Sequence, residues 1–534
     1  MPDSGLAYVA EPGVPSTVSA LLESRAETTP DAQFLTFQDT VLSYGEMVAR
    51  ADRTAAGLAA MGIGEGTKVA VLLPNSLEIL DVWFACSLMG AVLVPVNTGL
   101  VGEGLRYILE HSEAELLVVD PDLLETLEGA WPIADGLAKR FVRGGAEGLP
   151  SGYEPYSALT EAGDRGPRAS VGPETLASIL YTSGTTGLPK GVMNCHNSYV
   201  TAALEFSRNY VRMREDDVLY TSLPLFHVNA QSLTTLGSIV SGRPMVLSPR
   251  FSASRFFADL AAHEATVFNY IGAMLTMLYK QPEGPHDAEN KVRLTVGGAA
   301  PAELWRDFEK RFGLEVLEIY GLTESATFCC GSPPDAIKPG RIGKEVGWSE
   351  VKVVDENDEE LPADEPGEIV VRSKVPDTLF QGYYKNEEAT AESMKGGWFH
   401  TGDRGLRDAE GYFAFIDRLK DSIRRRGENI SSYEVERVVN SHPDVAESAA
   451  YGVPSDLGED EVMVTVIPRG DDVDCEDLIA FCEQRMAKFM VPRFVRVQEA
   501  LPKTATQRVQ KFELRKLGTE GAWDRLDSAE QIKR

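Results

Sequence analysis

Residues 178–192 read SILYTSGTTGLPKGV, and this stretch decides both the fold and the chemistry of the chain. The apolar run SILY predicts a buried strand that leads directly into a loop of glycines and hydroxyl-bearing residues. Glycines let a backbone approach a phosphate, N–H groups and hydroxyls donate to it, and a lysine supplies a point charge. The loop is not a Walker A motif, because no Gly-Lys-Ser/Thr follows it, and the alternative is a flexible surface turn. We predict a phosphate-binding loop formed by Thr182, Ser183, Gly184, Thr185, Thr186 and Lys190.

On both sides of this loop, short buried-strand patterns alternate with helical stretches. The strand patterns lie at 68–73, 91–96, 115–120, 176–181 and 314–320. Such alternation predicts an α/β fold with parallel-rich sheets covered by helices. Near residue 350 the pattern changes to two β runs around an acidic tip, which is typical of a hairpin. After residues 417–421 a small α+β unit begins, so we predict an N-terminal domain of residues 1–418 and a C-terminal domain of residues 419–534.

Length and composition exclude several classes of protein. At roughly 150 residues per domain, 534 residues leave room for three or four domain-sized units, more than a single binding module needs. With 52 Lys and Arg against 81 Asp and Glu, the net charge of −29 disfavours general binding to nucleic acids and anionic membranes. Six scattered cysteines, none in a CxxC pair, indicate free thiols in a reducing compartment. No signal peptide is visible, and the longest apolar stretch, 82–96, is too short to span a membrane, so we expect a cytoplasmic protein.

The loop YTSGTTGLPKGV resembles the signature loop of the adenylate-forming (ANL) superfamily, which contains acyl-CoA synthetases, peptide-synthetase adenylation domains and luciferases. The resemblance covers nearly the whole chain, because the other motifs of the superfamily follow in order. They are LPLFH (223–227), GGAA (297–300), YGLTE (320–324), TGD (401–403), DRLKDSIRRRGENIS (417–431) and LPKTATQRVQK (501–511). Within the superfamily, residues 268–278 and 481–492 are most similar to the carnitine/crotonobetaine-CoA ligase branch.

The resemblance implies a two-step reaction on the same scaffold. A carboxylic acid attacks the α-phosphate of ATP to give acyl-AMP and pyrophosphate, and the thiol of coenzyme A then displaces AMP. It also implies a small barrel-like subdomain in the N-terminal domain and a mobile C-terminal domain that rotates between the steps about a hinge near Lys420. Glu324 is expected to bind Mg²⁺, and Thr323 to donate to the α-phosphate. The remaining nucleotide-binding residues implied are Gly298, Ala299, Tyr320, Asp403 and Arg418.

The resemblance also places residues around the acyl group and coenzyme A. His227 matches a position between the nucleotide and the acyl pocket, although a lone histidine is more often structural. We expect the acyl pocket to include Phe226, Val228, Phe268, Gly272 and Ala273, the last two leaving room for a large acyl group. The run from Arg424 to Arg426 and the adjacent Gly427 lie where the resemblance puts the path of coenzyme A, whose phosphates suit cations. The alternative is that this run is a solvated face.

One motif departs from the superfamily pattern. Its C-terminal motif normally ends in Gly-Lys, and that lysine reaches the carboxylate and the α-phosphate during adenylation; here the pair is Gln507–Arg508. A guanidinium is wider and planar, so it does not replace a compact ammonium at a tight site. The first interpretation is an acyl-CoA synthetase that retains thioesterification, has weak or lost adenylation, and relies on a separate adenylating enzyme. The second is a competent two-step ligase that uses Arg508, Lys503 or Lys511.

Two further alternatives remain open, a non-catalytic nucleotide- or acyl-binding sensor and an enzyme that loads a carrier protein. The sequence leaves the acid undecided among a carnitine-like acid, a fatty acid, an aromatic acid and a bulky terpenoid or steroid acid. It gives no direct sign of the oligomeric state, for which the branch resemblance favours a homodimer.

Overall fold

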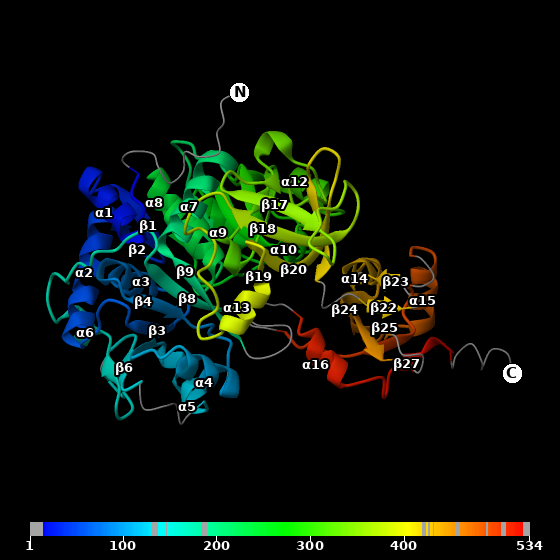
Figure 1. Cartoon of the computed structure of the whole chain (residues 1–534), viewed down its shortest axis with the longest axis horizontal. Helices are drawn as coiled ribbons and strands as arrows, with labels where there is room; N and C mark the ends of the chain where they lie inside the picture. Colours follow the sequence, from blue (N-terminus) through cyan, green and yellow to red (C-terminus); the bar gives the residue numbers. More distant parts are fainter. Residues whose placement is uncertain are drawn as a thin grey trace.

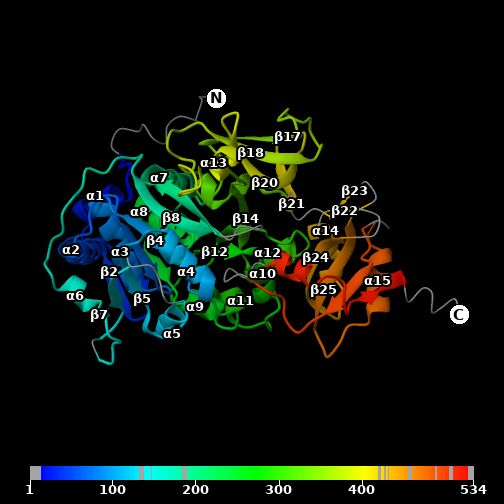
Figure 2. The same ribbon diagram turned by 60° about the horizontal axis from the view of Figure 1, so that its bottom comes forward.

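The computed structural model describes most of the chain. The described residues are 14–130, 137–145, 147–182, 189–418, 423–425, 428–430, 432–454, 460–486, 490–503 and 509–526. The N-terminal elements form one large body, and the last elements, orange and red in Figures 1 and 2, form a smaller one beside it.

Two large sheets build most of the N-terminal body. The seven-stranded sheet has the order β7 (Glu154–Pro155), β6 (Lys139–Val142), β5 (Leu116–Val119), β3 (Lys68–Leu72), β4 (Val92–Pro95), β8 (Leu176–Thr182) and β9 (Lys190–Cys195). The nine-stranded sheet has the order β16 (Lys344–Glu345), β15 (Cys330–Gly331), β14 (Glu315–Tyr320), β13 (Leu294–Gly298), β12 (Val267–Ile271), β10 (Leu219–Thr221), β11 (Met245–Leu247), β1 (Gln33–Phe37) and β2 (Thr40–Ser43). Most neighbouring strands are parallel, and the predicted strands appear as β3, β4, β5, β8 and β14.

Helices cover these sheets. They include α1 (Val18–Thr28), α2 (Tyr44–Ala60), α3 (Leu77–Met89), α4 (Gly102–His111), α7 (His196–Glu205), η3 (Ala230–Thr235), α8 (Leu236–Ser241), α9 (Phe256–Ala262), α10 (Gly272–Tyr279) and α12 (Trp305–Phe312). Helix α3 is buried along almost its whole length, as its largely apolar sequence favours, and its buried Asp81 is paired with Arg50. Helix α2 begins with a capping box in which Ser43 and Glu46 satisfy two of the free N–H groups at its start.

The predicted hairpin near residue 350 belongs to a third, antiparallel sheet. This sheet contains β17 (Ser349–Val354), β18 (Gly367–Ser373), β20 (Trp398–Arg407), β19 (Met394–Lys395) and β21 (Phe413–Arg418), with α13 (Glu387–Ser393) beside it. It lies where we expect the barrel-like subdomain, but among the described residues its ladder is open, ending at β17 on one side and at β19 and β21 on the other.

The smaller body is α+β, as predicted. Its elements are β22 (Ile423–Arg425), β23 (Glu428–Ile430), α14 (Ser432–Asn440), β24 (Val445–Pro454), β25 (Asp460–Pro468), α15 (Cys475–Glu483), β26 (Phe494–Val497), α16 (Lys511–Lys516) and β27 (Trp523–Asp524). Strands β24 to β27 form a four-stranded sheet with its own apolar core, which includes Val435, Val464 and Leu478. The predicted α/β fold with a small α+β C-terminal unit is therefore confirmed. Among the described residues, no helix combines the length and apolarity required to cross a lipid bilayer.

Candidate functional site

The segment predicted to bind phosphate lies between two antiparallel strands. Thr182 ends β8, Lys190 begins β9, and the two residues lie directly opposite each other in the register. The hairpin therefore fixes both ends of the loop, with Lys190 at its base. The other predicted phosphate ligands, Ser183, Gly184, Thr185 and Thr186, lie outside the described residues.

A segment far along the chain joins this hairpin to the YGLTE motif. The backbone N–H of Tyr384 donates to the carbonyl of Gly191 at 2.8 Å, which lays residues 380–384 beside β9. The Tyr383 hydroxyl then donates to Oε1 of Glu324 at 2.9 Å, and the Lys190 ammonium lies 4.6 Å from the centre of the Tyr383 ring. The structure thus brings Lys190 and Glu324 to the same place.

Glu324 is a buried carboxyl group in a partly cationic setting. Burial raises the pKa of Glu324, while the Tyr383 hydroxyl, Arg418 and Lys190 act in the opposite direction. A buried carboxylate next to a phosphate-binding hairpin offers the hard oxygen ligand that Mg²⁺ prefers. The residues present therefore fit a magnesium ion shared with a nucleotide phosphate, and Thr323 lies next to Glu324 in the same short 3₁₀ turn.

Three residues from different strands converge beside this group. Asp403 on β20 lies directly opposite Arg418 on β21, and Nε of Arg418 is 2.6 Å from Oδ1 of Asp403. The Tyr320 hydroxyl, at the end of β14, donates to Oδ2 of the same carboxylate at 2.7 Å. Asp403 is thus a buried, ion-paired carboxylate, and a carboxylate is the kind of group that accepts hydrogen bonds from a polyol such as ribose.

The GGAA motif contains a strained backbone position that sequence reasoning missed. Ala299 has φ of 66°, a left-handed conformation unusual for a residue with a side chain. Its N–H donates to Oε1 of Glu318 at 2.6 Å, and the N–H of Ala300 donates to Oε2 at 3.0 Å. The Tyr270 hydroxyl donates to the same carboxyl group at 2.7 Å. Glu318 therefore holds the turn that carries Gly298 and Ala299, and the only sequence signal was an acidic residue within a buried strand.

We expect the buried Glu318 to make the stability of the protein depend on pH. Burial raises the pKa of Glu318 from 4.5 to about 8, so the folded chain keeps a proton that the unfolded chain loses. This contribution is fully present below the unfolded pKa and disappears as the pH rises through the folded value. Glu318→Gln removes this titrating group. Between pH 6 and pH 8.5 the melting temperature of the variant should therefore fall by less than that of the native chain, as measured by thermal denaturation. An equal loss in both proteins would contradict this assignment.

His227 lies in a loop that a distant asparagine holds in place. Asn75, which is buried, accepts from the N–H of Leu225 at 2.8 Å and donates to the carbonyls of Leu223 and Ser248 at 3.0 and 2.9 Å. Burial lowers the pKa of His227 to about 4, so the ring is neutral near pH 7. Its Nε2 is buried without a hydrogen-bond partner among the described residues. A neutral imidazole with a free ring nitrogen can bind a substrate group but does not supply a positive charge.

The predicted acyl-pocket residues divide into two groups. Phe226 lies beside His227, with ring centres 4.7 Å apart, and Val228 follows in the same loop. The ring of Phe268 instead packs edge-to-face on Phe256 of α9 at 5.0 Å, in the core on that side of β12. Its place in the acyl pocket stays a prediction.

The next residue on β12, Asn269, lies beside the His227 loop. Asn269 donates to Asn229 at 2.8 Å and accepts from Thr234 at 2.6 Å, so an amide network borders the His227 loop. A strand turns alternate side chains to opposite faces, and this alternation could have indicated Asn269.

Gly272 has a structural role that the sequence did not indicate. A Cβ at this position would collide with the carbonyl oxygen of Ala299, so the glycine permits a close backbone contact with the GGAA turn. Its expected place in the acyl pocket stays a prediction. The side chain of Ala273 lies outside the described residues.

The predicted hinge and coenzyme A residues are only partly described. Lys420, Gly427, Arg508 and the side chain of Arg424 lie outside the described residues. Arg425 is 3% exposed, and its guanidinium lies 2.7 Å from Glu461 and donates to the carbonyl of Val491. The side chain of Arg425 is therefore held by contacts within the C-terminal domain. The run from Arg424 to Arg426 is for this reason not a uniform cationic face.

Both lysines near Arg508 are held in ion pairs. Lys503 contacts Glu447 at 2.7 Å, and Lys511 contacts Glu436 at 2.9 Å. Lys503 also pairs with Val509 in an isolated β-bridge. The residues on both sides of 504–508 are thus fixed within the C-terminal domain.

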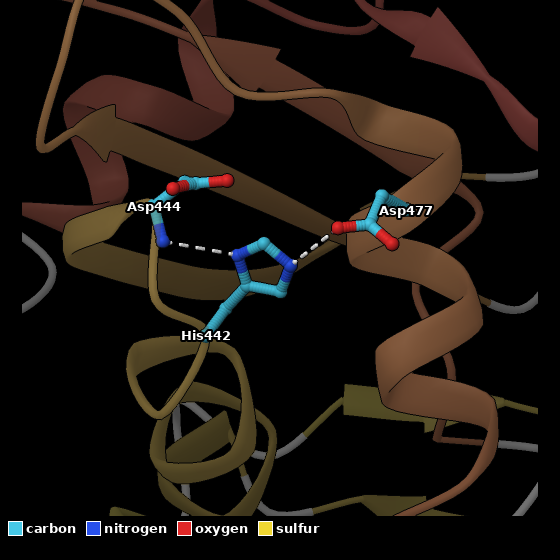
Figure 3. A group of neighbouring side chains, drawn as sticks. All are labelled: His442, Asp444 and Asp477. Atoms are coloured by element: carbon cyan, nitrogen blue, oxygen red, sulfur yellow. Dashed lines mark hydrogen bonds and ion pairs between the residues drawn. The ribbon is translucent and has the colours of Figure 1, made fainter.

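One further cluster has the composition of a metal site. His442, Asp444 and Asp477 lie close together at the end of α14 and the start of α15 (Figure 3). The Nδ1 atom of His442 accepts the N–H of Asp444 at 3.3 Å, so in the neutral ring Nε2 carries the proton that faces Asp477 at 3.2 Å. Both ring nitrogens are therefore used, one within the turn after α14 and the other in joining this turn to α15, and we assign the cluster a structural role.

Comparisons with known proteins agree with this geometry. Residues 22–384 match the family of AMP-binding enzymes, and residues 434–508 match the AMP-binding enzyme C-terminal domain. A crotonobetaine/carnitine–CoA ligase of Citrobacter koseri is 32% identical over 482 residues, which cover 89% of this chain and 93% of the relative.

Two solved structures are similar over nearly their whole length. The anthranilate CoA ligase AuaEII in complex with anthranoyl-AMP has a TM-score of 0.85 at 27% identity, covering 94% of this chain and 98% of the other. ATP-bound MatB from Rhodopseudomonas palustris has a TM-score of 0.83 at 29% identity, covering 94% and 99%.

Proposed function

The chain belongs to the AMP-binding enzyme family and is an acyl-CoA ligase that acts through an acyl-adenylate, and on this premise we propose that its two half-reactions are unequal. Thioester formation from acyl-AMP and coenzyme A is retained. Adenylate formation from ATP and the acid is slow, because Arg508 stands where the superfamily has a lysine. A second enzyme that supplies acyl-AMP would then feed this one.

The observation that carries the proposal is the pairing of the neighbouring lysines. Segment 501–511 contains three cations, Lys503, Arg508 and Lys511. The two lysines are held by Glu447 and Glu436, and breaking either ion pair would leave a partly buried carboxylate without its partner. Arg508 lies outside the described residues, and we assign it as the cation of this segment that meets the acid and the α-phosphate.

In the adenylation step, the acid oxygen bonds to the α-phosphorus and pyrophosphate leaves. We assign Lys190, Thr182 and the hydroxyl-bearing loop to the β- and γ-phosphates, and Thr323 to the α-phosphate. Glu324 would hold Mg²⁺, which neutralises phosphate charge. Tyr320, Gly298 and Ala299 would frame the adenine. Neutral His227 would stand between the nucleotide and the acyl group.

In the thioesterification step, the thiol sulfur bonds to the acyl carbon, AMP leaves, and the thiol proton goes to solvent. We assign this step to a second orientation of the C-terminal domain, rotated about Lys420, with the domain boundary between Arg418 and Leu419. Gly427 would line the thiol path and Arg424 would meet a phosphate of coenzyme A. Rotation removes the Arg508 loop from the nucleotide, so the substitution there spares this step.

The proposal is tested by two assays on one library of carboxylic acids, with carnitine-like, aromatic, fatty and steroid acids included. The first assay measures pyrophosphate release from ATP, and the second measures CoA thioester formed from synthetic acyl-AMP. We expect thioester formation from the adenylate of at least one acid whose pyrophosphate release is slow. Fast pyrophosphate release with the same acid would identify a competent two-step ligase, and no thioester from any adenylate would identify a binding protein.

Asp403→Asn should weaken nucleotide binding. The substitution replaces the carboxylate that faces Arg418 and Tyr320 with a neutral amide. Hydrogen bonds to charged groups contribute roughly 1.5–3 kcal/mol each, and this contribution to nucleotide binding would be lost. We expect the Kd for AMP, measured by calorimetry, to rise about 10- to 100-fold by that estimate. Asp408→Asn is the matched control, because Asp408 is also buried and ion-paired, with Lys338 at 2.9 Å. Equal affinities for AMP in the Asp403 variant and the native chain would contradict the assignment.

A further inference from the structure

A buried chain of hydrogen bonds links the phosphate hairpin to the His227 loop. Ser178 lies on β8, four residues before Thr182, and its Oγ is 2.7 Å from the Tyr199 hydroxyl. The Tyr199 hydroxyl donates to Oε1 of Gln231 at 2.8 Å. Nε2 of Gln231 donates to the carbonyl of Leu225 at 2.7 Å, two residues before His227.

The direction of this chain follows from its donors. Tyr199 has one hydroxyl proton and gives it to Gln231, so Ser178 must donate to Tyr199. Burial raises the pKa of Tyr199, which keeps this proton in place. The three residues are at most 1% exposed, and buried polar groups of this kind are nearly always hydrogen-bonded. A shift at either end therefore leaves a buried polar group unpaired unless the other end moves with it.

The two ends belong to different halves of the site. Ser178 is on the strand that ends at the phosphate loop, and Gln231 is in η3, where its N–H also approaches the carbonyl of His227 at 3.4 Å. Tyr199, on α7, lies between them, with its ring beside that of Trp83. Fully satisfied buried networks of this kind make their surroundings rigid.

We propose that Tyr199 is a positioning residue that couples strand β8 of the phosphate hairpin to the His227 loop, so that nucleotide binding at the hairpin orders the acyl side of the site. This inference rests on the proposed nucleotide-binding role of the hairpin. It adds a coupling between the two substrates that runs through Tyr199 and Gln231, which lie outside the motifs.

Hydrogen exchange measured by mass spectrometry tests the coupling without knowledge of the acid. The probe is α,β-methylene-ATP with Mg²⁺, and the reporter is the peptide covering residues 223–231. In the native chain the probe should slow exchange of this peptide by about 5-fold or more, since ordering reduces local opening. In Tyr199→Phe the slowing should fall below about 2-fold, while the Kd for the probe stays within about 3-fold of native.

Tyr44→Phe is the matched control, because it removes another buried tyrosine hydroxyl, which donates to the carbonyl of Ser238 at 3.2 Å outside this chain of bonds. It should keep the native response. If Tyr199→Phe does not fold, Ser178→Ala removes the same link with a smaller change and should show the same loss. If the probe slows exchange of the 223–231 peptide in either folded variant as much as in the native chain, the coupling inference is overturned and the proposed function is not affected. A native chain that does not bind the probe contradicts the proposed function as well.

Discussion

Arg508→Lys should raise the rate of ATP–pyrophosphate exchange by about 10²-fold, the scale of effect that one transition-state contact commonly has. A compact ammonium can approach both the carboxylate and the α-phosphate, whereas the planar guanidinium needs more room. Thioester formation from supplied acyl-AMP should stay within about twofold of native, because the proposed rotation carries this loop away before the thiol attacks.

Lys511→Arg is the matched control for this substitution. It makes the reverse exchange three residues further along, at a position that contacts Glu436, and should leave pyrophosphate exchange unchanged. The contradicting result is no gain of pyrophosphate exchange in Arg508→Lys together with loss of exchange in Arg508→Ala. Arg508 would then be a competent adenylation residue, and it would not make adenylation the slower half-reaction.

Glu324→Gln should lower adenylate formation by about 10²- to 10³-fold at saturating ATP, the usual effect of losing one preorganised charge contact. The amide keeps the shape of the side chain and can still bond Tyr383, but it is a poor magnesium ligand. The expected signature is a higher Mg²⁺ concentration for half-maximal rate, which a purely structural effect would not produce.

The pH profile provides a second signature of Glu324. Because burial raises its pKa, the charged form needed for magnesium is lost at a higher pH than for an ordinary glutamate, and adenylation should fall as the pH drops through that value. The small remaining adenylation activity of Glu324→Gln should not show this fall at low pH. Glu345→Gln, an exposed carboxyl group paired with Lys374, is the control. Unchanged magnesium and pH dependence in Glu324→Gln would contradict the assignment.

The sequence could predict features encoded by local pattern. Apolar runs with helical stretches between them predict strands such as β3 and β8, because burial on both faces requires continuous apolar sequence. The loop after β8 is recognisable because glycines, hydroxyls and a lysine stand together in a short segment.

The sequence could not indicate features created by tertiary contacts. Glu318 and Asn75 look like ordinary polar residues, yet each holds a site loop through backbone groups from another segment. Asn269 lies beside the His227 loop and Phe268 lies in the core because neighbouring residues of β12 point to opposite faces of the sheet. Which residue points to which face depends on the register of this strand in the sheet. Neither the close approach of Gly272 to the Ala299 carbonyl nor the ion pair of Arg425 with Glu461 could be read from the sequence, because each partner comes from a distant segment.

The most direct measurement of the central claim is a single-turnover comparison with one acid and rapid quenching. The enzyme is mixed with coenzyme A and either preformed acyl-AMP or ATP with the acid, and the rate of thioester formation is followed in both cases. The account predicts a rate from acyl-AMP at least about 10²-fold above the rate from ATP and acid, by the same scale of lost contact. Rates that agree within about threefold would contradict it.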